Sequence, residues 1–262
     1  MRLATFMPPG GDFAVAGEIL GDSVVGFSDG RTVCDVLAFG DRTPADGEPL
    51  PLTAVTLLAP IPRPGMIYGI GLNYAAHAAE TGATLPQQPI VFTKSPNAST
   101  APGGPVRCPI VVRRLDYEVE LVVVIGADSK VGGFAVANDV SARDLQRREP
   151  QWTRAKGADT FCPWGPWVTT TDEIGNPEDL RITSHVNGEL RQDSRTNDLI
   201  FGVDALVAFI SETNTLDPGD IILTGTPSGV GMAMDPPRFL ETGDVVTCEI
   251  ESLGVIEHRI ER

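Results

Sequence analysis

The chain has 262 residues, of which 42% are hydrophobic and 21% are charged, values typical of a globular protein with a core of normal size. Its formal net charge is −15. Because a negative field of this size repels nucleic acids and anionic membranes, we expect neither as a partner. The same field repels an anionic substrate, so a site for one must supply its own positive charge.

Targeting and redox features are sparse. The first residues contain no apolar run of signal-peptide length, and no stretch of about twenty apolar residues occurs elsewhere. We therefore expect a cytoplasmic protein. The cysteines are widely separated and lack the spacing of metal ligands, which favours free buried thiols over two disulfides. They are Cys34, Cys108, Cys162 and Cys248.

Glycine and proline occur throughout the chain, with 28 and 22 copies, while segments with helical periodicity are few. This pattern predicts a fold that is mostly β with some α, built from short strands and tight turns. Residues 1–60 are predicted to form a small β-rich N-terminal domain. A proline-rich stretch at 59–65 is expected to be extended and to mark the boundary to a larger domain at 61–262.

Short apolar segments predict the elements of the larger domain. Segments with strand character lie, in chain order, at 66–70, 90–93, 117–125, 134–137, 167–170, 181–186, 189–192, 221–224 and 245–260. Asn187-Gly188 predicts a tight hairpin turn between the strands on either side of it. Helical character is found in a short alanine-rich segment and in one longer amphipathic segment, at 75–79 and 198–213.

Acidic residues alternate within one apolar strand. Glu118 and Glu120 are two residues apart, so their side chains share one face of it. At about 6 Å and an effective dielectric of about 20, two such charges repel by roughly 3 kcal/mol. A buried pair therefore needs a cation, a shared proton or solvent, and a solvated sheet edge is the simplest alternative. Asp139 follows the next strand, and three convergent carboxylates suit a hard divalent ion such as Mg²⁺.

Basic residues near these carboxylates can provide the positive charge that an anionic substrate needs. Arg143 and Gln146 are three residues apart, and on a helical turn they lie on one face. Lys156 and, more weakly, Lys94 are further candidates. Each of these residues is equally compatible with an exposed surface position.

A histidine and a glycine-rich turn complete the candidate residues. His77 and Glu80 are at positions i and i+3 of the alanine-rich segment, where a carboxylate can orient an imidazole as a general base, although such pairs are commonly exposed helix contacts. In the turn at 224–231, backbone N–H groups around Gly225 and the Thr226 hydroxyl can hold a carboxylate. The turn lacks the lysine of a phosphate-binding loop, so no nucleotide site is predicted.

Seven segments, taken together and in order, resemble the fumarylacetoacetate hydrolase family. They are GLNYAAHAAE (71–80), DYEVEL (116–121), NDVSARDLQ (138–146), KGADTF (156–161), GPW (165–167), LTGTPSGVG (223–231) and GDVV (243–246). The resemblance covers residues 60–262, and the preceding residues are similar to a small domain that many relatives carry. It implies a mixed β-sandwich or roll, usually assembled as a homodimer.

The resemblance also implies roles for individual residues. Mg²⁺ or Mn²⁺ would be held by Glu118, Glu120 and Asp139. His77 and Glu80 would form a catalytic dyad on a segment that orders over the bound substrate, a small anionic oxo acid, with Lys156 assisting electrostatically. The residues implied to contact the oxo-acid end are Arg143, Gln146, Lys156 and Thr226.

The implied activity is hydrolysis of a carbon–carbon bond in a small acylpyruvate or β-diketo acid, by a water that the dyad activates. The alternative is decarboxylation or isomerisation of a 2-oxo dicarboxylic acid at the same metal site, and a third reading is a non-catalytic family member. Two features depart from the family pattern. The connection between Gly126 and Gly132 is short, which should leave the ligands in place, with a shift of Asp139 as the alternative. His258 stands where asparagine is common.

Overall fold

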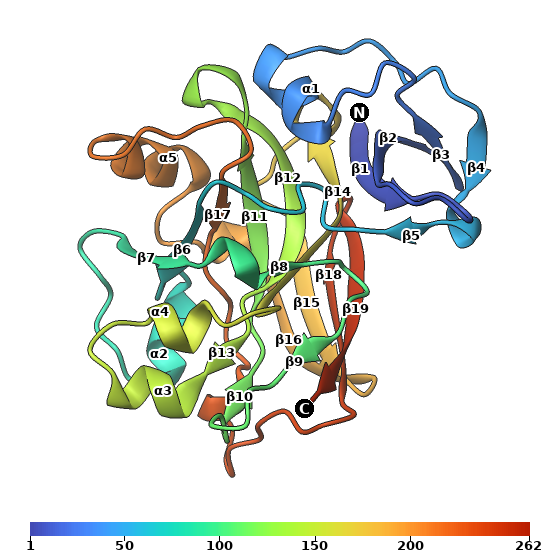
Figure 1. Ribbon diagram of the computed structural model, residues 1–262. Helices are drawn as coiled ribbons and strands as arrows, with labels where there is room; N and C mark the ends of the chain where they lie inside the picture. The colour runs from blue at the N-terminus through green and yellow to red at the C-terminus, as the bar shows by residue number, and fades with distance from the viewer.

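The computed structural model describes residues 1–262. Its strands form a 12-stranded sheet, a five-stranded sheet and a two-stranded pair, connected by loops and a few short helices (Figure 1). The predicted class, mostly β with some α, is confirmed.

Residues 1–60 form the unit at the upper right of Figure 1. Its strands are β1 (Arg2–Met7), β2 (Val15–Leu20), β3 (Ser23–Gly26), β4 (Pro49–Pro51) and β5 (Thr56–Leu57). The prediction of β structure missed one helix, α1 (Val33–Phe39), which begins at a capping box formed by Thr32 and Asp35. β1 pairs with β14 (Cys162–Thr170) of the larger part, so the two parts share one sheet. The division into two domains stays a prediction.

The large sheet continues through the centre of the molecule in the order β1-β14-β12-β11-β17-β6-β7. The strands beyond β14 are β6 (Ile67–Gly71), β7 (Ile90–Lys94), β11 (Val119–Ile125), β12 (Val131–Asn138) and β17 (Ile221–Leu223). These strands and β14 all overlap predicted strands, but β12 and β14 begin earlier in the chain than predicted. β14 includes Pro163 and Pro166, which argue against a strand in a sequence. Its pairing with β12 shifts register between Phe134 and Val136.

The five-stranded sheet has the order β16-β15-β18-β19-β9. Its strands are β9 (Val106–Arg107), β15 (Arg181–Val186), β16 (Glu189–Arg195), β18 (Val245–Ile250) and β19 (Gly254–Glu261). The predicted turn at Asn187 and Gly188 is confirmed, with φ of 52° and 79°. The segment predicted as strand-like at 245–260 is a hairpin of two strands, because Ser252 adopts a left-handed conformation and reverses the chain.

The remaining elements are short. Three small strands are β8 (Ser99–Thr100), β10 (Leu115–Asp116) and β13 (Ser141–Ala142). The helices are α2 (Ala75–Glu80), α3 (Arg143–Arg148), α4 (Thr153–Lys156) and α5 (Val203–Ser211). Single 3₁₀ turns lie at Leu52–Ala54, Pro96–Ala98, Ala127–Ser129, Thr171–Glu173, Thr196–Asp198 and Gly231–Ala233. α5 is shorter than the helix predicted at 198–213 because the chain turns helical only after Gly202.

None of these helices has the length and the apolar character needed to cross a lipid bilayer.

The short connection between β11 and β12 leaves the strand pairing regular from Val119 to Val124, and the register shifts only beside the connection. A single 3₁₀ turn at Ala127–Ser129 joins them, and Val119 is paired with Asn138 at the far end of the ladder. Asp139 therefore lies beside Glu118, and its N–H donates to the Glu118 carbonyl at 2.8 Å. The prediction that the short connection leaves these residues in place is confirmed.

The two sheets pack together through the inward side chains of β19. Ile256, His258 and Ile260 alternate with exposed residues and are buried. The Nδ2 atom of Asn138 donates to Nε2 of His258 at 2.9 Å, while its Oδ1 accepts the N–H of Glu118 at 2.8 Å. Burial lowers the pKa of His258 to about 3. His258 is therefore a neutral core residue at physiological pH.

Replacing His258 should change how stability depends on pH. A histidine whose pKa in the folded state lies below its unfolded value of about 6.5 takes up a proton on unfolding at lower pH. Its contribution to stability is therefore present above pH of about 6.5. It is lost as the pH falls toward 3, at about 1.4 kcal/mol per pH unit. Between pH of about 7 and about 5, the free energy of unfolding of His258→Asn should therefore fall by up to about 2 kcal/mol less than that of the wild type. Urea unfolding of metal-free wild type and variant measures this, and equal losses in both would contradict it.

Candidate active site

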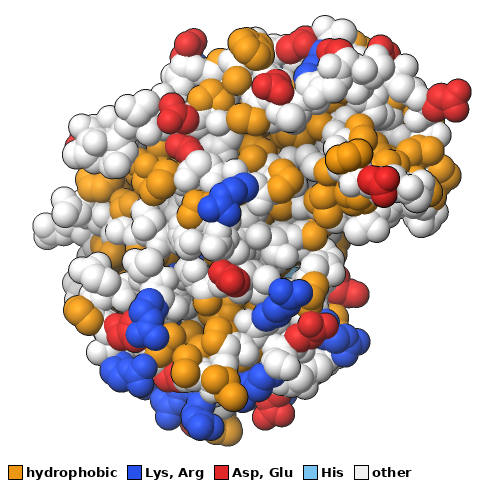
Figure 2. Space-filling view, in the orientation of Figure 1, with side chains coloured by type: hydrophobic (Ala, Val, Ile, Leu, Met, Phe, Trp, Pro, Cys, Tyr) orange, Lys and Arg blue, Asp and Glu red, His pale blue; other side chains and the backbone are white.

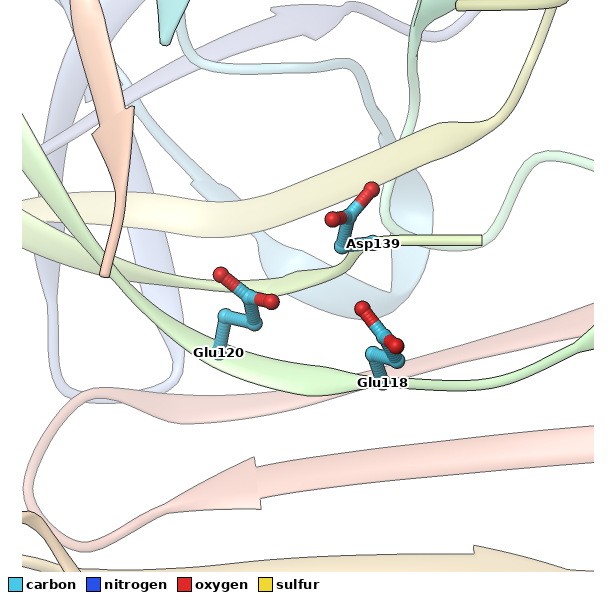
Figure 3. A group of neighbouring side chains, drawn as sticks. All are labelled: Glu118, Glu120 and Asp139. Atoms are coloured by element: carbon cyan, nitrogen blue, oxygen red, sulfur yellow. The ribbon is translucent and has the colours of Figure 1, made fainter. Parts of the chain in front are cut away.

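Three carboxylates converge where β11 begins and β12 ends. Glu118 directly precedes β11, Glu120 is its second residue, and Asp139 directly follows β12. One ligand oxygen from each lies within 4.8 Å of the other two, and all three residues are buried. Figure 3 shows the two glutamates pointing from the same strand toward the aspartate. The sequence argument that Glu118 and Glu120 share a face, with Asp139 nearby, is confirmed.

Cations balance two of the three carboxylates. The Nζ atom of Lys156 bridges Glu118 Oε2 at 2.5 Å and Asp139 Oδ2 at 2.7 Å. Arg143 donates to the other oxygen of Glu118 at 2.5 Å, and Lys94 contacts the other oxygen of Asp139. Burial opposes ionisation of Glu118, but the charges of Arg143 and Lys156 outweigh it and hold the pKa of Glu118 well below its usual value.

Glu120 has no ion-pair partner. Its Oε2 atom accepts the N–H of Gly225 at 2.7 Å. Burial raises the pKa of Glu120 well above its usual value, and the negative charges of Asp139 and Glu118 raise it further. A divalent cation would remove this repulsion, and an all-oxygen donor set is what Mg²⁺ and Mn²⁺ prefer. The residues present therefore fit such an ion.

A fourth buried carboxylate fixes Arg143. Asp116 accepts hydrogen bonds from Arg143 Nε at 2.8 Å and from the backbone N–H groups of Gly231 and Met232 at 2.8 and 3.0 Å. A third guanidinium nitrogen of Arg143 donates to Gln146 Oε1 at 3.0 Å. The sequence reading assigned Asp116 no role, because nothing in the sequence shows that it is fully buried beside an arginine.

A cavity of about 310 Å³ lies against these groups, at the small end of the range for ligand clefts. The predicted site residues that line it are His77, Glu118, Glu120, Arg143, Gln146, Lys156 and Thr226. The lining residues that sequence reasoning missed are Ile70, Gly71, Leu72, Thr81, Ala83, Phe92, Arg147, Trp152 and Met232. Most of these are apolar or flank the recognised motifs, so no local pattern marks them.

Two predicted substrate contacts lie behind the cavity wall. Lys94 is fully buried against Asp139 and the Val140 carbonyl. The N–H of Gly225 is used by Glu120. Neither residue lines the cavity, so any effect they have on a substrate is exerted through the carboxylates that they contact.

Thr226 reaches the cavity, but its hydroxyl is already hydrogen-bonded. It donates to the Val119 carbonyl at 2.9 Å and accepts from Gln192 Nε2 at 2.7 Å. Gln192 lies on β16, and its Oε1 also accepts the N–H of Val119 at 3.1 Å. This buried glutamine, which the sequence did not single out, joins the second sheet to the floor of the site.

The predicted histidine–glutamate pair is formed on α2. Nδ1 of His77 lies 2.7 Å from Oε1 of Glu80. Because an ionised carboxylate only accepts, Nδ1 carries the hydrogen and Nε2 is left with its lone pair in the neutral ring. The second oxygen of Glu80 accepts the N–H of Gly229 at 3.0 Å, so the glycine-rich turn holds the glutamate and, through it, the imidazole.

The segment that carries α2 is tied to the rest of the site. Asn73 donates to the carbonyls of Phe201 and Thr224 at 3.0 and 2.8 Å and accepts the N–H of Phe201 at 2.9 Å. The N–H of Ala76 donates to Asp198 at 3.1 Å. These bonds hold His77 in the cavity wall. Ordering of the segment over a substrate stays a prediction.

Comparisons with known proteins agree with this geometry. Residues 66–261 match the family described as fumarylacetoacetate (FAA) hydrolase C-terminal. The mitochondrial oxaloacetate tautomerase of Rattus norvegicus is 46% identical over 222 residues, which cover 80% of this chain and 71% of that protein.

Solved structures share the fold over the whole chain. A 5-carboxymethyl-2-hydroxymuconate delta-isomerase of Mycobacterium smegmatis is 36% identical, with a TM-score of 0.84 and 100% of both chains covered. A fumarylacetoacetate hydrolase of Exiguobacterium antarcticum is 32% identical, with a TM-score of 0.90, over 100% of this chain and 99% of that one. The chain belongs to the fumarylacetoacetate hydrolase family.

Proposed function

We propose that this member of an enzyme family catalyses the enol–keto interconversion of a small 2-oxo dicarboxylic acid. The observation that carries the proposal is the convergence of a buried carboxylate triad, Lys156 and the His77–Glu80 pair on one cavity. A 46% identical relative named as a tautomerase and a 36% identical one named as an isomerase support this reaction class. The sequence argument ranked carbon–carbon hydrolysis first, and these relatives are the reason for preferring its alternative.

The charge balance of the site favours an anionic substrate beside a metal ion. Four carboxylates, those of Asp116, Glu118, Glu120 and Asp139, face the three cations Lys94, Arg143 and Lys156. A divalent Mg²⁺ or Mn²⁺ held by the last three of these carboxylates would turn the small negative excess into a positive one. When bound, such an ion supplies Lewis acidity that stabilises negative charge on a 2-oxo group.

Residues of the chain itself can carry out the proton transfer. Interconversion removes the proton from the enol oxygen and adds one to the carbon next to the one that carries this oxygen, or the reverse. His77 lines the cavity and Glu80 keeps its Nδ1 protonated, which leaves Nε2 as the ring nitrogen that can exchange a proton with that carbon. Lys156 places a buried positive charge at the carboxylate face of the cavity, where it stabilises the charge that develops on oxygen.

Hydrolysis is the second candidate, and the dyad is the observation that favours it. A histidine oriented by a carboxylate can equally remove a proton from water, which would then attack the distal carbonyl of an acylpyruvate. Decarboxylation of a 2-oxo dicarboxylic acid needs no activated water and remains part of the alternative reaction class. A non-catalytic member would bind oxo acids without turnover.

The oligomeric state and the cellular location of the protein are two further proposals. We propose the homodimer that the family resemblance implies and the cytoplasmic location that the sequence predicts. The rat relative is named as a mitochondrial protein, so fractionation of cells that express the chain is the test of location.

Metal binding should depend strongly on Glu120. Unlike the other two carboxylates of the triad, Glu120 has no lysine or arginine partner. Glu120→Gln should weaken Mn²⁺ binding by at least about tenfold, and excess EDTA should abolish turnover in the wild type until Mg²⁺ is restored. Calorimetric titration measures the affinity. Glu18→Gln, at a buried carboxylate on β2, is the control and should bind as the wild type does. Unchanged affinity in the Glu120 variant would refute the site.

His77 should be needed for proton transfer in the proposed reaction. His77→Asn should lower kcat for tautomerisation of oxaloacetate by about 10²- to 10⁴-fold and leave KM nearly unchanged, as followed by the ultraviolet absorbance of the enol. Acetylpyruvate cleavage is measured in parallel. His185→Asn, the same change on β15 outside the cavity, should have no effect. Wild-type cleavage of acetylpyruvate without tautomerase activity would move the protein to the hydrolases.

The glycine-rich turn should affect turnover through its hydrogen bond to Glu80. Gly229 has φ of +104°, and a Cβ there would lie 2.1 Å from the Arg191 carbonyl oxygen. Gly229→Ala must displace the turn and its bond to Glu80, so kcat should fall by about tenfold to hundredfold while Mn²⁺ affinity is retained. Gly243→Ala is a matched control, because Gly243 also has positive φ but its Cβ would meet open space. Equal kcat in both variants would contradict this role for the turn.

A further inference from the structure

The cations deep in the cavity are already engaged by protein carboxylates. All three guanidinium nitrogens of Arg143 have acceptors, on Asp116, Glu118 and Gln146. Lys156 lies between Glu118 and Asp139. These residues can balance one carboxylate of a substrate beside a metal ion, but they leave no free cation for a second one.

Arg147 is the exception among the charged lining residues. It lies in the cavity wall, is exposed, and forms no salt bridge or side-chain hydrogen bond. On α3 it follows Arg143 by four residues, so the two share a helix face and their Cα atoms are about 6 Å apart along the axis. Exposure rises along that face, from Arg143 at 4% to the exposed Arg147, which places Arg147 toward the solvent end of the cavity.

The rest of this outer wall offers little to an anion. Leu72, Ala83, Trp152 and Met232 contribute mainly apolar surface. The hydroxyl of Thr81 is directed to the carbonyls of His77 and Ala78 within its own segment. A carboxylate that extends outward from the carboxylate triad therefore has one charged group to meet.

Basic residues gather on and near the helix that carries Arg147, although the protein as a whole carries −15. Figure 2 shows Lys and Arg side chains gathered over the lower part of the molecule, around α3 and β10. Arg147 and Arg148 are the exposed arginines of α3, and the exposed Arg113 and Arg114 directly precede β10. Local positive charge of this kind attracts anions that the net charge repels.

We propose that Arg147 binds the second carboxylate of the substrate and thereby selects dicarboxylic over monocarboxylic 2-oxo acids. The proposal rests on the proposed function, whose reaction leaves the distal group of the substrate open. Arginine forms charge-assisted, often bidentate bonds with a carboxylate. Arg147 makes these bonds with the distal carboxylate, while the 2-oxo acid end stays beside Lys156 and the triad.

The test compares two acids that differ only at the distal group. Oxaloacetate carries a carboxylate where 2-oxobutyrate carries a methyl group. Binding to the Mg²⁺-loaded enzyme is followed by tryptophan fluorescence, because Trp152 lines the cavity. Arg147→Gln should weaken binding of oxaloacetate by about tenfold to hundredfold and leave that of 2-oxobutyrate within about twofold, with Arg147→Lys restoring part of the loss.

Arg148→Gln is the matched control. Arg148 is the next residue, is also exposed, but lies outside the cavity and pairs with Glu149 at 3.7 Å, so both acids should bind its variant as they bind the wild type. An equal loss for the two acids in Arg147→Gln, or no loss, would overturn the assignment. Selective binding of oxaloacetate that depends on Arg147 without any turnover would uphold the assignment and defeat the proposed reaction instead.

Discussion

Four carboxylates buried side by side are the constraint on which the rest of the structure depends. Asp116, Glu118, Glu120 and Asp139 are each at most 5% exposed, and unbalanced charges in an interior are strongly destabilising. Their counter-charges come from the end of β7, the start of α3 and the end of α4. Segments distant in the sequence must therefore pack against one strand. The glycine-rich turns add backbone donors at Gly225 and Gly231.

The two sheets hold this charged cluster in place through uncharged amides. Asn138 supports the backbone of Glu118 and is itself held by His258 of β19. Gln192 of β16 reaches Val119 on one side and Thr226 and Pro227 on the other. Neutral groups suit this position, because another charge beneath the carboxylates would shift their pKa values. The geometry of the site thus depends on the contact between the sheets as well as on the residues that face the cavity.

Alternation and turn chemistry made much of this predictable from the sequence. The common face of Glu118 and Glu120 follows from strand alternation, and the hairpin follows from its Asn187-Gly188 turn. The proximity of Asp139 was expected from its place after the next strand. The α1 helix was missed because its signal is one capping box in a glycine-rich region, and the start of β14 was missed because prolines normally exclude strands. The places of Lys94, Asp116 and Gln192 depend on contacts between residues far apart in the chain, which no local pattern records.

The position of the site within the large sheet has a kinetic consequence. β11 lies between β12 and β17 in the interior of the sheet, whereas β7 is an edge strand that pairs only with β6. The α2 segment connects β6 to that edge. An opening confined to the edge breaks few ladder hydrogen bonds and exposes the cavity, while the strands that carry the carboxylates stay paired on both sides. Small molecules can then enter and leave the cavity while the strands that carry the carboxylates keep their positions.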